Sequence, residues 1–115
     1  MYIPEYIETA MKPTYVPEGW TMECMSSDDS MVSYIMLGEN EAMVIFEQIP
    51  MDEENLMVDN NADSVEDIWL NGMAAKLFLY PDGEIHLAWS NQYTFAITGQ
   101  NVDKEMLVKI ANNIK

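Results

Sequence analysis

Apolar and polar residues alternate along most of this chain, and the alternation is clearest near its C-terminal end. Between residues 84 and 99 the apolar side chains occupy every second position on both sides of a short polar break. A period of two places them on one face of a sheet. The pattern therefore predicts two adjacent strands, Glu84–Ser90 and Tyr93–Gly99. Their shared apolar face carries Ile85, Leu87, Trp89, Tyr93, Phe95 and Ile97.

After residue 100 the apolar spacing changes to three and four residues, which is the spacing of a helix. The helix is predicted over Asp103–Ile114, with Asp103 as its N-cap residue. Its apolar stripe consists of Leu107, Ile110, Ala111 and Ile114. A one-sided sheet followed by a one-sided helix removes both apolar surfaces from water when the helix lies on the sheet.

Turn residues divide the rest of the chain into five more strands and a short N-terminal helix. The helix is predicted over Tyr2–Met11, with Pro4 in its first turn. The strands are predicted at Trp20–Ser26, Met31–Leu37, Ala42–Ile49, Val65–Leu70 and Met73–Tyr80. The fold class is thus α+β: an antiparallel sheet of about seven strands, a C-terminal helix on one face and a short N-terminal helix. We divide the chain into an N-terminal segment, residues 1–13, and a single domain, residues 14–115.

The dipeptide Asn71-Gly72 is the strongest hairpin signal in the sequence, and a two-residue loop there fixes the register of its strands. This register sets Asp67 opposite Lys76, which is an attractive cross-strand pair. It also places a second apolar set on the face opposite the helix. That set contains Val65, Trp69, Ala74, Phe78 and Tyr80.

The register of the last hairpin follows from its apolar sets. We expect a three-residue loop, 90–92, that pairs Trp89 with Tyr93 and Leu87 with Phe95. A slip of one residue would turn the apolar face toward solvent.

The candidate binding residues are the large aromatics of the second face, Trp69, Phe78 and Tyr80. Large aromatic side chains need cover, either within the fold or from a partner. One interpretation is that the N-terminal segment or the first three strands cover them. The other is that they form a surface for a peptide, an apolar ligand or a protein partner.

The formal charge of −15 is large for 115 residues, and the chain contains no arginine. Such a surface repels phosphate backbones, so nucleic acid is excluded as a partner. Acidity of this kind is typical of a soluble surface. The oligomeric state cannot be derived from these features.

Catalytic chemistry has little support in the sequence. Cys24 is the only cysteine, so no internal disulfide forms, and its strand parity predicts a buried, inert thiol. His86 is the only histidine, and neither residue lies in a motif of nucleophilic catalysis. We therefore expect no enzymatic activity and no cofactor.

The acidic stretch between residues 52 and 67 supports the alternative functions, a cation-binding domain or a small enzyme. Asp59, Asn61 and Asp63 match the first ligand positions of an EF-hand loop. The match then fails, because Ser64 stands where glycine is needed and Leu70 where the bidentate glutamate belongs. A looser site would use Asp59, Asp63, Glu66 and Asp67. We interpret the stretch as a solvated loop and expect no metal site.

No stretch approaches the ~20 apolar residues of a membrane span, and no signal peptide opens the chain. We therefore expect no direct membrane insertion. These features predict either a cytoplasmic protein or one whose export segment or anchor is missing from the sequence.

Several motifs occur in an order that resembles a known family. They are Tyr15-Val16-Pro17-Glu18-Gly19-Trp20, Ile68-Trp69-Leu70-Asn71-Gly72, Leu87-Ala88-Trp89, Phe95-Ala96-Ile97-Thr98-Gly99 and Lys109-Ile110-Ala111-Asn112-Asn113-Ile114. The first resembles the "Y-x-P-x-G-aromatic" opening of an uncharacterised bacterial family, a domain of unknown function. The resemblance covers Pro13 to Lys115.

Members of this family often lie outside the membrane, C-terminal to a single anchor helix, in proteins similar to anti-sigma factors. The resemblance implies a curved antiparallel sheet with a packed helix, loosely similar to lipoprotein carriers and sigma-regulator sensor domains. It supplies no catalytic residues. On this basis we expect a non-catalytic binding or sensor module, extracytoplasmic and membrane-tethered in its natural context.

Overall fold

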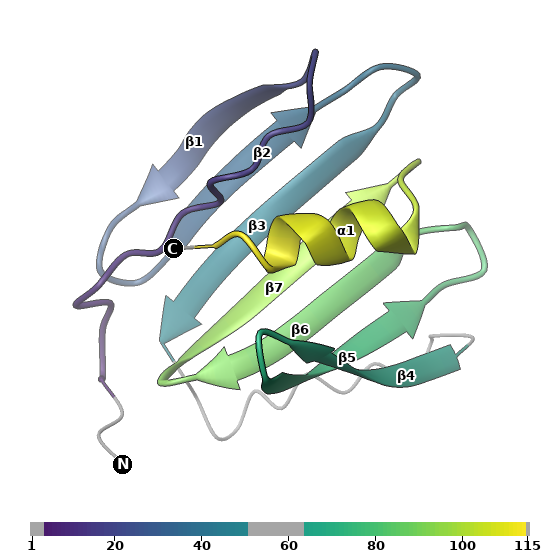
Figure 1. Cartoon of the computed structure of the whole chain (residues 1–115). Helices are drawn as coiled ribbons and strands as arrows, with labels where there is room; N and C mark the ends of the chain where they lie inside the picture. Colours follow the sequence, from purple (N-terminus) through teal and green to yellow (C-terminus); the bar gives the residue numbers. More distant parts are fainter. Residues whose placement is uncertain (1–3, 51–63, 115) are drawn as a thin grey trace.

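A computed structural model describes residues 4–50 and 64–114 and contains one open antiparallel sheet followed by one helix (Figure 1). The sheet has the order β1-β2-β3-β7-β6-β5-β4. The strands are β1 Thr21–Ser27, β2 Val32–Leu37, β3 Met43–Pro50, β4 Ser64–Leu70, β5 Met73–Leu79, β6 Ile85–Asn91 and β7 Tyr93–Gln100. The helix is α1 Lys104–Ala111. The seven predicted strands and the C-terminal helix are confirmed, and the described chain is mostly β.

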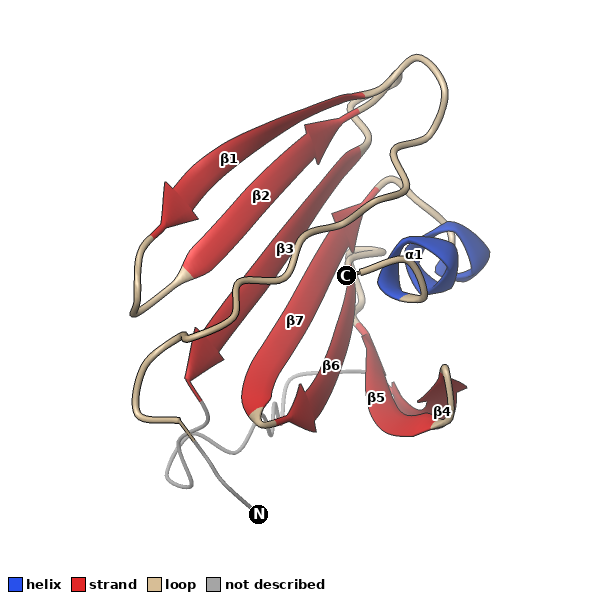
Figure 2. Cartoon of the chain, turned by 60° about the vertical axis from the view of Figure 1, so that its left-hand side comes forward, coloured by secondary structure: helices blue, strands red, loops and turns tan. Residues whose placement is uncertain are grey.

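The sheet is curved, and its two faces are unequally covered. Figure 2 shows β5 and β4 turning toward the side on which α1 lies. Two contacts join the curled end to the helix: Lys104 Nζ lies 2.7 Å from Glu66 Oε2, and Asn71 Nδ2 donates to the Asn112 carbonyl at 3.0 Å. We call the side that holds α1 the concave face and the other side the convex face.

The helix begins where it was predicted but ends at Ala111 rather than at Ile114, and its apolar stripe packs on the concave face. Asp103 is its N-cap, and the Asp103 carboxylate accepts a hydrogen bond from the Met106 amide at 2.8 Å. The core between the sheet and the elements on this face includes Val44, Phe46, Leu77, Leu87, Trp89, Phe95, Ile97, Leu107, Ile110 and Ala111. Gly99 lies under the start of the helix, where an added Cβ would stand 2.5 Å from the Val102 side chain.

The predicted N-terminal helix is wrong. Residues 4–20, which we call the strap, run across the concave face beside α1 without forming a helix (Figure 1). Pro13 forms an isolated β-bridge with Ile114, and the Thr14 amide donates to the Asn113 carbonyl at 2.7 Å. The strap is therefore the second element that covers the concave face.

Side chains of the sheet hold the strap in place. Gln48 is fully buried; its Oε1 accepts from the Met11 amide at 2.7 Å, and its Nε2 donates to the Thr9 carbonyl at 2.9 Å. The Tyr93 hydroxyl accepts from the amides of Glu8 and Thr9 at 3.1 and 3.2 Å. The three amides in these tertiary bonds are groups that a helix would have paired internally, which explains why the apolar spacing was misleading.

The two hairpin predictions have different outcomes. The register set by Asn71-Gly72 is confirmed: Leu70 faces Met73, and Asp67 faces Lys76. The register of the last hairpin is wrong by two residues, because Asn91 pairs with Tyr93. Consequently Trp89 faces Phe95 and Leu87 faces Ile97. The turn is tighter than expected because Gln92 adopts a φ of 63°. Glutamine rarely adopts a positive φ, so the sequence did not predict this turn.

Candidate functional site

The register of β4 and β5 places Val65, Trp69, Ala74 and Phe78 on the convex face, as the sequence predicted. Neither α1 nor the described part of the strap lies on this face, because both pack on the concave side (Figure 2). Strands β1, β2 and β3 extend the same sheet and do not fold over it. The interpretation that residues 1–13 cover the aromatics is therefore wrong for residues 4–13.

The three predicted binding residues have different environments. Trp69 is 72% exposed, whereas Phe78 is only 6% exposed. Tyr80 is half-buried, and its ring centroid lies 4.5 Å from that of His86. Ala74 faces Trp69, so Tyr80 lies six residues along from that pair, a strand length of roughly 20 Å. The structure therefore does not bring Trp69 and Tyr80 into one cluster.

What the convex face does present is a short row of exposed side chains along β4. Val65 is 50% exposed, the Asp67 side chain is 81% exposed, and Trp69 follows two residues later. These three residues share a side of the strand because they lie at alternate positions. We call them the β4 row. Lys76 Nζ, on the neighbouring strand, lies 2.6 Å from Asp67 Oδ1. Val65 was predicted to lie on this face but was not among the candidate binding residues, because its apolar character is ordinary for a strand.

The concave face contains a small crevice between the strap and α1. Its volume is about 60 Å³. Its walls are formed by Met11, Leu70, Asn71, Met73, Trp89, Asn91, Phe95, Ala111 and Ile114. Ligand sites for small molecules are usually 300–1,000 Å³ in volume. The crevice is thus too small for a lipid-like ligand in this conformation.

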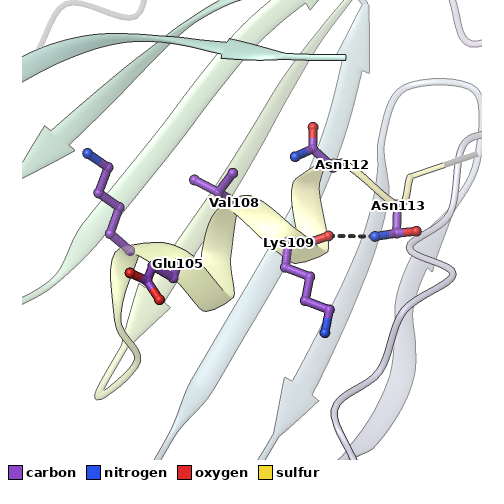
Figure 3. Close-up of a pocket in the computed structure, with 6 residues that line it drawn as sticks. Glu105, Val108, Lys109, Asn112 and Asn113 are labelled. Atoms are coloured by element: carbon purple, nitrogen blue, oxygen red, sulfur yellow. Dashed lines mark hydrogen bonds between the residues drawn. The ribbon is translucent and has the colours of Figure 1, made fainter.

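A shallow, open shelf lies beside α1 (Figure 3). Its lining consists of Lys104, Glu105, Val108, Lys109, Asn112 and Asn113. Both lysines already have partners: Lys104 contacts Glu66, and Lys109 Nζ lies 4.5 Å from the centroid of the Tyr15 ring. The shelf therefore offers little unpaired charge to an anionic ligand.

The candidate catalytic residues lie far apart. Cys24 is on β1 and His86 is on β6, four strands away, a separation of roughly 19 Å at the usual strand spacing. His86 Nε2 is 2.7 Å from Glu84 Oε1. The prediction that Cys24 is buried is wrong, because β1 is an edge strand and leaves its thiol exposed. The structure thus forms no Cys–His pair.

Two groups in the β1–β2 region have shifted pKa values. The pKa of Asp28 is lowered by hydrogen bonds from the Ser30 hydroxyl, the Ser30 amide and the Met31 amide, in that order. The pKa of Tyr34 is raised by burial and by the neighbouring Cys24. Asp28 caps the turn between β1 and β2, and Tyr34 faces Cys24 across the strands. Both shifts have local structural causes.

The proposed cation ligands are only partly described. Asp59 and Asp63 lie outside the described residues. Glu66 and Asp67 each contact a lysine, Lys104 and Lys76 respectively. Within residues 4–50 and 64–114 no group of three or more histidine, cysteine or acidic side chains is arranged to hold a metal ion.

Comparison with known proteins gives one match. A family model described as a domain of unknown function, DUF4367, matches residues 10–114. Searches among curated proteins and among solved structures give no significant match. None of the helices in the described part of the chain has the length and apolar character needed to cross a membrane. Because the family model spans nearly the whole sequence, the chain belongs to the DUF4367 family, a domain of unknown function.

Proposed function

We propose that this domain is a non-catalytic binding module whose contact surface for a protein or peptide partner is the β4 row. The observation that carries the proposal is the exposure of Trp69, 72% on a face that neither α1 nor the described strap covers. Tryptophan is among the residue types that contribute most to interface energy. Val65 adds apolar surface beside it, and Asp67 adds a charge between them.

Charge gives this surface a preferred class of partner. The chain carries a formal charge of −15, and Asp67 lies between the two apolar members of the row. Its contact with Lys76 is exposed, so the pair is weak and leaves the carboxylate accessible to a basic partner. Electrostatic complementarity speeds the encounter with basic partners and disfavours acidic ones. A protein or peptide partner also fits better than a small apolar ligand. The concave crevice holds only about 60 Å³, and the larger shelf beside α1, about 490 Å³, is open to solvent and has Val108 as the one apolar residue in its described lining.

We further propose that the domain acts as a sensor outside the membrane. Its support is the resemblance to domains of membrane-anchored proteins that are similar to anti-sigma factors. Adjacency of the gene to a sigma-factor gene would support this context. Turnover of a generic ester or phosphoester that is lost on His86→Ala would contradict the non-catalytic role.

The binding role can be tested with displayed peptides. Peptides selected by the wild-type domain from a random library are measured against Trp69→Ala and against Leu37→Ala. Leu37 is a suitable control because it is 49% exposed and lies on the convex face of β2, far from β4 in the sheet.

We expect Trp69→Ala to weaken the selected peptides about thirtyfold, the effect of losing a hot-spot residue of ~2 kcal/mol. Leu37→Ala should leave their affinity within about twofold, as expected outside a hot spot. Equal binding to wild-type protein and Trp69→Ala, or no enrichment over a selection without the domain, would overturn the proposed function.

A further inference from the structure

We propose that the free edge of β4 binds an extended basic peptide as an additional antiparallel strand. This inference rests on the binding role proposed above and specifies its partner. β4 stands at one end of the sheet, and among the described residues it pairs only with β5. An unpaired edge presents backbone amides and carbonyls that can pair with another chain. Recognition by strand addition takes affinity from those groups and specificity from alternate side chains.

The hairpin register identifies which backbone groups of β4 face outward. Asn71 and Gly72 have φ values of 49° and 84°, which fit a two-residue type I′ loop. The residues that flank such a loop exchange hydrogen bonds with each other, and bonded and non-bonded positions then alternate. The amides and carbonyls of Val65, Asp67 and Trp69 therefore point to the free edge. The residues of the β4 row thus offer both their side chains and their backbone groups.

The opposite edge of the sheet is less suited to strand addition. The pairing of β1 with β2 shifts register between Cys24 and Ser26, which marks a bulge. Bulges twist an edge and interrupt its pairing pattern. The β4–β5 register runs without interruption from Ser64 to Leu70. A regular incoming strand therefore fits the β4 edge better than the β1 edge.

The side chains of the β4 row distinguish between two occupants. A second copy of the chain, paired antiparallel about Asp67, would set two Asp67 carboxylates opposite each other, and like charges in that position are unfavourable. Each copy would also bring a formal charge of −15. A basic residue opposite Asp67 would instead form an attractive pair. It would share the carboxylate with Lys76, whose ion pair with Asp67 is exposed and therefore contributes little. Apolar residues two positions away on either side would face Val65 and Trp69.

These contacts define a probe. The blocked peptide Thr-Val-Thr-Arg-Thr-Val-Thr places its arginine opposite Asp67 when its valines face Trp69 and Val65. Its threonines suit an extended chain, because β-branched residues favour strands. The matched control replaces the arginine by glutamate. A second control carries N-methyl groups on the amides of the two valines and the arginine, which removes the donors directed at β4 and keeps every side chain.

The peptide is added to the whole domain while backbone amide signals and hydrogen exchange are followed by NMR. We expect binding with a dissociation constant of about 1 mM or tighter. Exchange at the amides of Val65, Asp67 and Trp69 should slow on binding, while Cys24 and Ser26 on the opposite edge should not change. The glutamate peptide and the N-methylated peptide should each bind at least about tenfold more weakly.

Two protein variants separate the contribution of the Asp67 charge to peptide binding from that of the β4 backbone amides. Asp67→Lys should reverse the preference, so that the glutamate peptide binds more tightly than the arginine peptide. Val65→Pro removes one outward amide without removing a bond to β5, because proline is tolerated where an edge amide faces solvent. It should keep the melting temperature near that of the wild type and weaken the arginine peptide.

Each remaining outcome decides against the addition of a basic peptide as a strand. Absence of arginine-peptide binding, unchanged exchange on β4, or equal binding of the N-methylated peptide would overturn it. A dimer in sedimentation with protected β4 amides and no peptide would identify a second copy as the occupant instead. The proposed function is tested separately, because library peptides that depend on Trp69 but leave the β4 amides unprotected would sustain it while this inference failed.

Discussion

The two faces of the sheet are covered in different ways. On the concave face α1 and the strap cover the sheet, and Leu107 and Ile110 are fully buried there. On the convex face of β4, Trp69 remains 72% exposed although it is as large an apolar surface as any on the chain. Side chains on the concave face therefore stabilise the fold, whereas Trp69 on the convex face is available to a partner. Substitutions on the two faces should therefore have unequal effects on stability.

The largest effect is expected at the centre of the concave interface. Ile110→Asp places an unpaired charge where the native side chain is fully buried. We expect a loss of about 4 kcal/mol or more in the free energy of unfolding, enough to abolish a cooperative thermal transition in a marginal domain. The conservative change Ile110→Val should cost only about 1 kcal/mol. A cooperative melt of Ile110→Asp near the wild-type temperature would contradict the packing of α1.

The attachment of the strap to the sheet should depend on the buried side-chain amide of Gln48. Gln48→Leu removes both hydrogen bonds to the strap and leaves the Met11 amide and the Thr9 carbonyl without those partners. We expect a loss of about 2–4 kcal/mol, because each buried group left unsatisfied costs about 1–3 kcal/mol. Chemical denaturation measures the loss, and faster hydrogen exchange at the Met11 amide localises it. Unchanged exchange at Met11 would show that Gln48 does not hold the strap.

The contact between β7 and the start of α1 should tolerate no added methyl group. In Gly99→Ala the new Cβ would lie 2.5 Å from Val102 Cγ2 and 3.1 Å from Leu107 Cδ1. Overpacking of this kind typically costs about 1–3 kcal/mol. The double variant Gly99→Ala, Val102→Ala should recover part of that loss, because the shorter side chain removes the closest clash. Additive losses in the double variant would exclude the contact as the cause.

The smallest effect is expected at an exposed turn and depends on pH. Hydrogen bonds from Ser30 and Met31 hold the pKa of Asp28 below its ordinary value of 3.8. The folded state therefore favours the carboxylate, so its stabilising contribution is present above pH 3.8 and is lost as the pH falls through the lowered pKa. An NMR titration of the Asp28 carboxyl should give a midpoint below 3.8, and the Asp28→Asn variant should lose less stability in acid. A midpoint at or above 3.8 would contradict these hydrogen bonds.

The sequence predicted features that are determined locally. The Asn71-Gly72 loop sets the β4–β5 register because its turn type allows few alternatives. Likewise, the stripe of Leu107 and Ile110 can be buried only by lying on the apolar face of the sheet. The placement of Trp69 on the face opposite α1 followed from these two predictions.

Other features were not predicted correctly, because they depend on residues far apart in the chain or on a pattern that fits more than one structure. The first part of the strap, up to Met11, was predicted as a helix because its bonds to Gln48 and Tyr93 join positions far apart in the chain. The last hairpin was wrong by two residues because a slip of two leaves every side chain on its original face. Phe78 is buried although it shares the convex face with the exposed Trp69. This difference depends on which parts of the face are covered, and the period of two carries no information on that.

If Trp69 contributes to binding and not to the fold, two matched tryptophan substitutions should differ sharply in their effect on stability. Trp89 lies on the concave face, is 7% exposed and stacks on Phe95 with ring centroids 5.3 Å apart. Free energies of unfolding are measured for Trp69→Ala and Trp89→Ala by chemical denaturation. We expect the free energy of unfolding to fall by no more than about 0.5 kcal/mol for Trp69→Ala and by about 3–5 kcal/mol for Trp89→Ala. Comparable losses for both variants would mean that Trp69 belongs to the core and would contradict its role as a binding residue.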